Sequence, residues 1–121
     1  MQKLAVEFFR QGYNCSQSIL KAAEILYNIK VPEESFNMCK GVGSGFGTGS
    51  LCCSLVGGIM VFGLMFDENT TKCMRIKLMD LFYQKYGSTQ CGLLLKLMKD
   101  DCERIIADAA YMTNQIIKGS L

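Results

Sequence analysis

The longest apolar stretch of the chain covers residues 51–66 and constrains the fold more than any other feature. It has 16 residues, three of which are glycines. As an α-helix it would be about 24 Å long, whereas the hydrocarbon core of a bilayer is about 30 Å thick. We therefore expect a central helix that is buried inside a protein core, and no direct insertion into a membrane.

Segments on both sides of this stretch place apolar residues at helical spacing. Asn14 and Ser50 are suited to N-caps, Pro32 to a first helical turn and Gly87 to a helix end. No stretch alternates apolar and polar residues between hairpin signals. We predict an all-α fold, a compact bundle of about six or seven helices around the glycine-containing central helix. The predicted helices lie within residues 3–12, 14–28, 32–39, 51–65, 72–87, 90–98 and 102–119.

Length and charge limit the class of protein. A chain of 121 residues that is half hydrophobic suits a single helical domain spanning residues 1–121. Thirteen Lys and Arg against eleven Asp and Glu leave a net charge of +2 without a basic block, which argues against nucleic acid as a partner. The N-terminal segment lacks the apolar region and the cleavage site of a secretory signal. We therefore expect a cytoplasmic protein.

Seven cysteines and the absence of histidine define the available side-chain chemistry. An odd number at irregular spacing is not typical of a disulfide scaffold, which a reducing cytosol also disfavours. Without histidine, Cys-His and Ser-His catalysis are excluded, and zinc is left with an all-cysteine or cysteine–carboxylate site. No pair has the Cys-x-x-Cys spacing of zinc ribbons, ferredoxins or thioredoxin-like motifs.

A glycine-rich loop, "GVGSGFGTGSLCC", occupies residues 41–53 and raises the question of phosphate binding. A phosphate loop needs a preceding strand and a following lysine, and the sequence predicts neither. The loop leads instead into the central helix, with Cys52 and Cys53 in its first turn. A helix N-terminus stabilises a thiolate and lowers its pKa. The alternative is that the glycines only allow helices to pack closely.

Four cysteines lie within about one turn of a candidate helix cap and begin the apolar stripe of their helices: Cys15, Cys52, Cys91 and Cys102. We expect their sulfur atoms to converge. Cys39 is interpreted as core filling, whereas Cys73 stays undecided because Asn69 is a candidate cap for its helix. The caps for the four are Asn14, Ser50, Ser88 or Thr89, and Asp100 or Asp101.

Four elements, "GYNCSQSIL", "GSGFGTGSLCCSLVGGIMVFGL", "YGSTQCGLLL" and "CERII", resemble the C_GCAxxG_C_C family of small redox-active proteins. The resemblance runs from Gly12 to about Ala110 and implies redox chemistry and a functional link to a membrane transporter. It places the family cysteines at Cys15, Cys52, Cys91 and Cys102, with Gly57 closing a Cys-Gly-Ala-x-x-Gly motif. Cys53 and Ser54 depart from that motif, so Cys52 and Cys53 are both candidate reactive thiols, and we favour Cys52.

The leading hypothesis is a thiol-based redox protein, a thiol–disulfide oxidoreductase without a cofactor and with an unidentified redox partner. In it a thiolate at Cys52 attacks a disulfide or an oxidant, and Cys15 or Cys91 resolves the product. The alternative is a binding module in which Cys15, Cys52, Cys91 and Cys102 hold zinc or an iron–sulfur cluster. A third hypothesis is a small helical adaptor whose cysteines only pack. A homodimer is among the assemblies that remain open.

Overall fold

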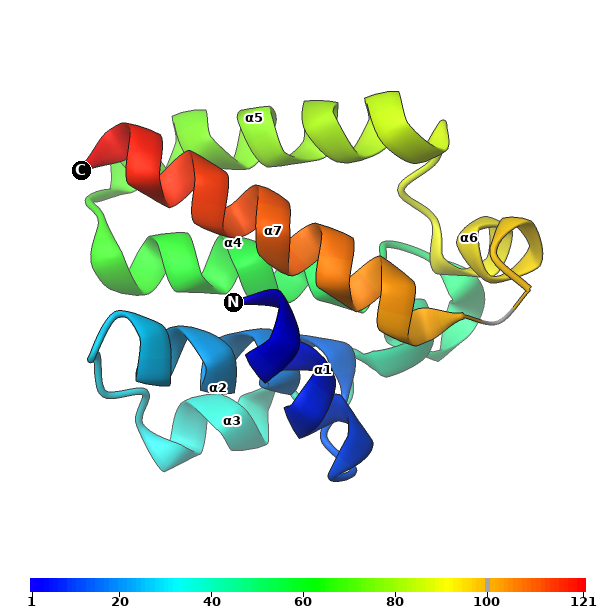
Figure 1. Ribbon diagram of the computed structural model, residues 1–121, viewed down its shortest axis with the longest axis horizontal. Coiled ribbons are helices and arrows are strands. Elements are labelled where there is room, and N and C mark those ends of the chain that lie inside the picture. Colours follow the sequence, from blue (N-terminus) through cyan, green and yellow to red (C-terminus); the bar gives the residue numbers. More distant parts are fainter. Residues whose placement is uncertain (100) are drawn as a thin grey trace.

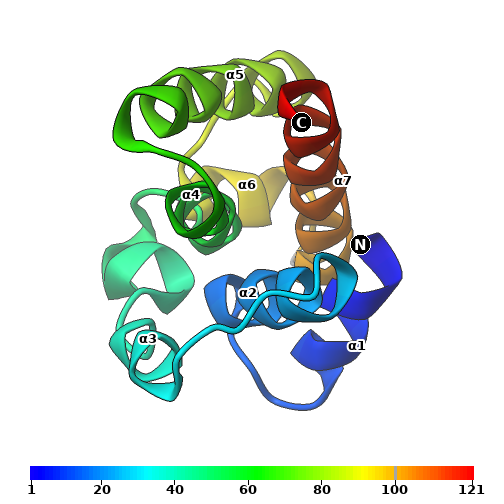
Figure 2. The ribbon, with the colours of Figure 1, turned by 90° about the vertical axis from the view of Figure 1, so that its left-hand side faces the viewer.

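A central helix, α4 (Cys53–Met65), runs through the middle of the molecule (Figure 1). The computed structural model describes residues 1–99 and 101–121, which form seven α-helices and one π-helical segment. The end-on view of Figure 2 shows other helices packed around α4. The predicted all-α fold with a glycine-containing central helix is confirmed. The surrounding helices are α2 (Cys15–Leu26), α5 (Glu68–Tyr86) and α7 (Cys102–Ser120), with α1 (Gln2–Arg10) against α2 and α7, and α3 (Glu33–Met38) after α2.

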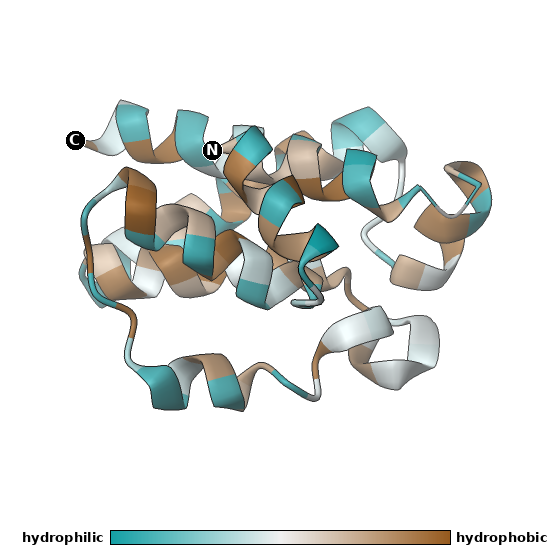
Figure 3. Cartoon of the chain, turned by 60° about the horizontal axis from the view of Figure 1, so that its bottom comes forward, coloured by the Kyte–Doolittle hydropathy of each residue, from teal (hydrophilic) through white to brown (hydrophobic). Residues whose placement is uncertain are grey.

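Neighbouring helices cover α4 on several sides, which explains why its sequence has no polar face. In Figure 3 its residues are mostly brown or pale, whereas brown and teal residues alternate along α7. Two glycines bring the helices close together. A Cβ atom at Gly57 would lie 2.8 Å from Cα of Ser16 on α2, and one at Gly58 would lie 2.6 Å from Oγ1 of Thr113 on α7. Any larger residue would push these helices apart.

Several helix ends follow the predicted capping signals. Asn14 forms a capping box with Gln17 at the start of α2. Asp101 caps α7, since its side chain accepts the N–H of Arg104, and Gly87 ends α5 with a φ of +71°. The other predicted cap of α7, Asp100, lies outside the described residues.

Three predicted helix caps are wrong. The N-cap of α6 (Cys91–Leu97) is Gln90, without a side-chain cap, rather than Ser88 or Thr89. Helix α4 begins at Cys53, with Cys52 rather than Ser50 in the N-cap position. Ser50 is engaged elsewhere, because its N–H donates to the Gly45 carbonyl at 3.0 Å and its carbonyl accepts the N–H of Cys91 at 2.6 Å. Helix α5 begins earlier than expected, because the Asp67 side chain accepts the N–H of Thr70 and caps it.

The glycine-rich loop forms the π-helical segment η1 (Gly45–Gly49), which packs against α6 (Cys91–Leu97). Gly45 has a φ of +61°, and a Cβ there would lie 2.4 Å from the Ser50 nitrogen and 2.9 Å from Cβ of Cys91. A hydrogen bond from the Cys52 N–H to the Thr89 carbonyl, 2.8 Å long, also joins the two segments. The loop therefore fixes the start of α6 beside the start of α4. None of the described helices combines the length and the apolar character needed to cross a bilayer.

Candidate functional site

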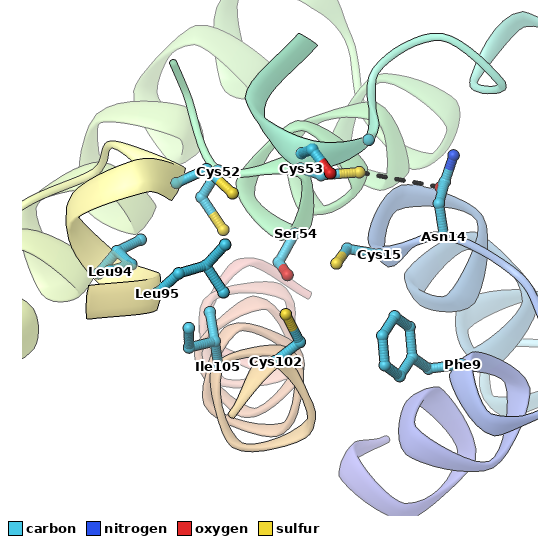
Figure 4. Close-up of a pocket in the computed structure, with 13 residues that line it drawn as sticks. Phe9, Asn14, Cys15, Cys52, Cys53, Ser54, Leu94, Leu95, Cys102 and Ile105 are labelled. Carbon is cyan, nitrogen blue, oxygen red and sulfur yellow. Dashed lines mark hydrogen bonds between the residues drawn. The ribbon is translucent and has the colours of Figure 1, made fainter. Parts of the chain in front are cut away.

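Five cysteines line one cavity of about 170 Å³, at the end of the bundle where four helices begin (Figure 4). Cys15, Cys53, Cys91 and Cys102 are the first residues of α2, α4, α6 and α7, and Cys52 directly precedes α4. The structure thus brings the four predicted cysteines together with Cys53. Apolar side chains form another part of the wall: Phe9, Leu94, Leu95 and Ile105.

The remaining two cysteines lie elsewhere. Cys39 is fully buried in the core, and its thiol donates to the Ser35 carbonyl at 3.3 Å and to the Met60 sulfur at 3.5 Å. This agrees with its interpretation as core filling. Cys73 lies exposed on α5, away from the cavity.

Cys53 lies where the first turns of two helices meet. It begins α4, and its sulfur accepts the backbone N–H of Ser16, in the first turn of α2, at 3.1 Å. The Ser16 hydroxyl also lies 3.1 Å from this sulfur and donates to the Cys53 carbonyl at 2.6 Å. The dashed line of Figure 4 marks a longer contact of 3.8 Å to Oδ1 of Asn14. The positive ends of α2 and α4 therefore both face this sulfur.

This environment stabilises the Cys53 thiolate. Its pKa is lowered to about 6, mainly because the Cys15 thiol donates a hydrogen bond to it, and further because Ser16 donates its N–H and holds its hydroxyl beside the sulfur. The same hydrogen bond raises the pKa of Cys15, together with burial and the negative charge of Cys53. A proton shared by the pair is therefore favoured on Cys15 and disfavoured on Cys53.

Cys52 does not have the low pKa that we expected at the start of the central helix. Its side chain is only 4% exposed, and this burial raises its pKa, although hydrogen bonds from Ser54 and Leu55 offset part of the effect. Cys52 occupies the N-cap, so its sulfur lacks the contact with α2 that Cys53 has. The structure therefore favours Cys53, not Cys52, as the thiolate of the pair.

Cys91 and Cys102 form the other side of the cavity and are both partly buried. Burial raises the pKa of Cys91, and the negative charge of Cys53 raises it further. Cys91 is therefore a thiol rather than a thiolate near neutral pH. Cys102 begins α7 behind its Asp101 cap, and Figure 4 shows its sulfur directed toward the cavity.

Ser54, the residue after Cys53, places a hydroxyl in the cavity wall. The residue is 0% exposed, and its Oγ has no oxygen or nitrogen partner in the described part of the chain, although it lies close enough to the Cys15 and Cys52 thiols to offset part of the rise in their pKa. Figure 4 shows this oxygen pointing toward the space between Cys15 and Leu95. Because the neighbouring thiols are weak hydrogen-bonding groups, Oγ of Ser54 is available to donate to a ligand in the cavity.

Sequence reasoning missed Ser16, Asn14 and Ser54 as parts of the site. The available signal was the capping box of α2, because it fixes the first turn of that helix and leaves the Ser16 N–H without an intrahelical acceptor. The contact itself joins residues 37 positions apart, which no local pattern reveals.

The arrangement also bears on metal binding. Within residues 1–99 and 101–121, no three side chains of Cys, Asp or Glu are grouped closely enough to hold one metal ion. The cysteines share the cavity without forming a ligand set in this structure.

Comparison with protein families gave one match. The family model described as "Putative redox-active protein (C_GCAxxG_C_C)" matches residues 13–116. Neither the curated proteins nor the solved structures gave a match.

The motif in the family description corrects the alignment that we made from the sequence. Its letters run Gly-Cys-Ala-x-x-Gly. With Gly57 as the last glycine, the motif cysteine falls on Cys53, Cys52 stands at the first glycine and Ser54 at the alanine. The assignment of the motif cysteine to Cys52 used the order Cys-Gly-Ala-x-x-Gly, in which the first cysteine and glycine are exchanged. Because the model covers most of the chain, this protein belongs to the C_GCAxxG_C_C family of redox-active proteins.

Proposed function

We propose that this protein is a thiol-based redox protein in which Cys53 is the attacking thiolate and Cys15 the resolving thiol. The observation that carries the proposal is the Cys53 sulfur, which accepts the Ser16 N–H at 3.1 Å inside a cavity lined by four further cysteines. The redox description of the family supports the same class of chemistry.

The reaction moves two electrons from the cysteine pair to a substrate X–Y. The Cys53 thiolate attacks X, a Cys53–X bond forms, and Y leaves with the electron pair of the X–Y bond. Cys15 then attacks the Cys53 sulfur, a Cys15–Cys53 disulfide forms, and X leaves with the electron pair of the Cys53–X bond. The Cys15 thiol provides one proton to the leaving groups and water provides the other.

The charge on Cys53 determines the order of these two steps. Before attack, the hydrogen bond to Cys53 and the negative charge of Cys53 keep Cys15 protonated. Once Cys53 is covalently bound, both effects are gone, so the pKa of Cys15 falls and its thiolate becomes available for the second step. Cys15 therefore becomes a nucleophile only after Cys53 has reacted.

Site-resolved alkylation with iodoacetamide tests the proposal. We expect the rate at Cys53 to follow an ionisation with a midpoint near pH 6, well below the ordinary thiol value of 9.0. Mild oxidation with diamide should then give a Cys15–Cys53 disulfide in peptide maps. The proposal is wrong if the Cys53 midpoint lies near the ordinary thiol value of 9.0 and no Cys15–Cys53 disulfide forms.

Metal binding is the second function that these cysteines could serve, because thiolates are the preferred ligands of zinc and iron–sulfur clusters. The absence of a three-residue ligand group among the described residues favours the redox function. Metal analysis of anaerobically purified protein separates the two. One zinc ion or cluster per chain that protects Cys15 and Cys53 from alkylation would support the binding module instead.

A further inference from the structure

The cavity around Cys53 limits the size of the molecule that can reach its sulfur. Cys53 is only 1% exposed, so the sulfur is reached through the cavity and not from the protein surface. The volume of about 170 Å³ holds about five water molecules and is smaller than the roughly 300 to 1,000 Å³ of pockets for drug-sized ligands. A disulfide carried by another protein does not fit this space.

The cavity wall also indicates which atoms the ligand carries. Its polar groups include Asn14 and Ser44, but the Ser54 hydroxyl is the one that is 0% exposed, has no oxygen or nitrogen partner among the described residues and points into the cavity (Figure 4). A hydroxyl donates well to oxygen and only weakly to sulfur. Phe9, Leu95 and Ile105 on the other side suit a small apolar group. The complementary ligand is therefore small, has an acceptor oxygen and tolerates an alkyl group.

We infer that the substrate of this site is a small hydroperoxide, either hydrogen peroxide or a short-chain alkyl hydroperoxide, and that Ser54 donates a hydrogen bond to its leaving oxygen. This inference rests on the proposed function, because it needs Cys53 as the attacking thiolate. It adds the class of substrate and a role for a hydroxyl that stands where the family motif has alanine.

Cys53 and Cys15 reduce the hydroperoxide in two steps. The Cys53 thiolate attacks the terminal oxygen of ROOH, an S–O bond forms, the O–O bond breaks, and RO⁻ leaves. Cys53 becomes a sulfenic acid, and RO⁻ takes the proton of the Cys15 thiol to give ROH. The Cys15 thiolate then attacks the Cys53 sulfur, the disulfide forms, and the hydroxide that leaves takes a proton from water. Two electrons have passed from the two cysteines to the peroxide.

Ser54 acts on the first step. Negative charge develops on the leaving oxygen as the O–O bond breaks, and a fixed donor in a site shielded from water stabilises that charge. Afterwards a small thiol reductant restores the pair by attacking Cys15, which is more exposed than Cys53. A second thiol completes the reduction, so two thiols become one disulfide for each peroxide reduced.

Rapid kinetics of the reduced protein tests the inference. We compare hydrogen peroxide and tert-butyl hydroperoxide with glutathione disulfide, each with dithiothreitol as the final reductant. We expect both peroxides to oxidise Cys53 at least tenfold faster than the disulfide does. In a Cys15→Ser variant, dimedone should label the sulfenic acid on Cys53. Ser54→Ala should slow the peroxide reaction roughly tenfold, the effect of one hydrogen bond, without moving the pH midpoint of Cys53 alkylation.

The matched control is Thr113→Val, which removes another fully buried hydroxyl, one that is bonded within α7 and lies outside the cavity. It should leave the peroxide rate unchanged. If glutathione disulfide reacts faster than the peroxides, the inference is wrong and the proposed function stands. If Cys53 reacts with neither and shows no low pH midpoint, both are wrong. An unchanged peroxide rate in Ser54→Ala would show that Ser54 does not assist the reaction.

Discussion

Gly57 on α4 is in direct contact with Ser16 on α2, since a Cβ at Gly57 would lie 2.8 Å from the Ser16 Cα and 3.0 Å from the Ser16 carbonyl oxygen. Ser16 in turn donates its N–H to the Cys53 sulfur, one helical turn before Gly57. The last glycine of the family motif therefore has a physical role at the site. It lets the start of α2 come close enough to reach the cysteine of the same motif.

Replacing Gly57 with alanine should raise the pKa of Cys53 by about one unit, since the added methyl group pushes Ser16 away and weakens its hydrogen bonds to the sulfur. The pH midpoint of Cys53 alkylation measures this shift. Overpacking should also lower the free energy of unfolding by about 1 to 3 kcal/mol, measured by urea denaturation.

Two other glycines of α4 are the controls for Gly57→Ala. Gly58→Ala meets Thr113 and Leu78 instead of Ser16, so it should destabilise the protein without shifting the Cys53 midpoint. Gly63→Ala meets nothing within 4 Å and should stabilise the helix by up to about 1 kcal/mol. An equal midpoint in Gly57→Ala and Gly58→Ala would show that the contact with Ser16 does not control the thiol.

Cys15→Ala should raise the alkylation midpoint of Cys53 more than Cys15→Ser does. The largest cause of the low Cys53 pKa is the hydrogen bond that the Cys15 side chain donates. Alanine removes this donor, whereas the serine hydroxyl keeps one in nearly the same place. Identical midpoints in the two variants would contradict the assignment of Cys15 as the donor.

Protein stability should increase as the pH rises from about 6 toward about 9, the ordinary value of a thiol. In this window Cys53 is deprotonated in the folded protein and protonated in the unfolded chain, so the unfolded chain binds more protons and folding is favoured at higher pH. The contribution is lost as the pH falls through 6. Urea denaturation of the reduced protein at several pH values, compared with Cys53→Ser, isolates it, because the variant should lack this slope.

Gly45→Ala should destabilise the protein by at least about 2 kcal/mol more than Gly47→Ala. Both glycines have a positive φ, so both substitutions carry the cost of a left-handed residue. Only the Gly45 Cβ meets neighbours, at 2.4 Å from the Ser50 nitrogen and 2.9 Å from Cβ of Cys91. Thermal unfolding measures the difference, and faster alkylation of Cys91 in Gly45→Ala would show that the start of α6 has moved. Equal losses in the two variants would mean that this packing is unimportant.

The sequence was sufficient to predict the features that depend on neighbouring residues. Asn14 and Gly87 act as the helix cap and the helix end that their types favour. The apolar run became the central helix for the same reason, since only a buried helix suits residues that are apolar on every side. The positions of cysteines at the starts of helices also follow from such local signals.

The choice between Cys52 and Cys53 could not be predicted, because it depends on where α4 starts to within one residue. A capping signal at Ser50 suggested an earlier start, but Ser50 is bonded to Gly45 within the glycine-rich loop and to Cys91 from a distant part of the chain. The Ser16 contact with Cys53 is equally long-range. Local sequence signals indicate that a cysteine lies at the start of a helix. Tertiary packing determines which other helix lies against its sulfur.

The meeting of α2 and α4 at Cys53 has a consequence for the reduction potential of the site. The hydrogen bonds from Ser16 and the two helix ends stabilise a sulfur that carries negative charge. A Cys15–Cys53 disulfide carries no such charge and forgoes that stabilisation, so the dithiol state is favoured over the disulfide state. The Cys15–Cys53 pair is therefore an oxidising couple, whose disulfide is readily reduced by an incoming thiol. The geometry that activates Cys53 for attack also makes the pair easy to reduce again.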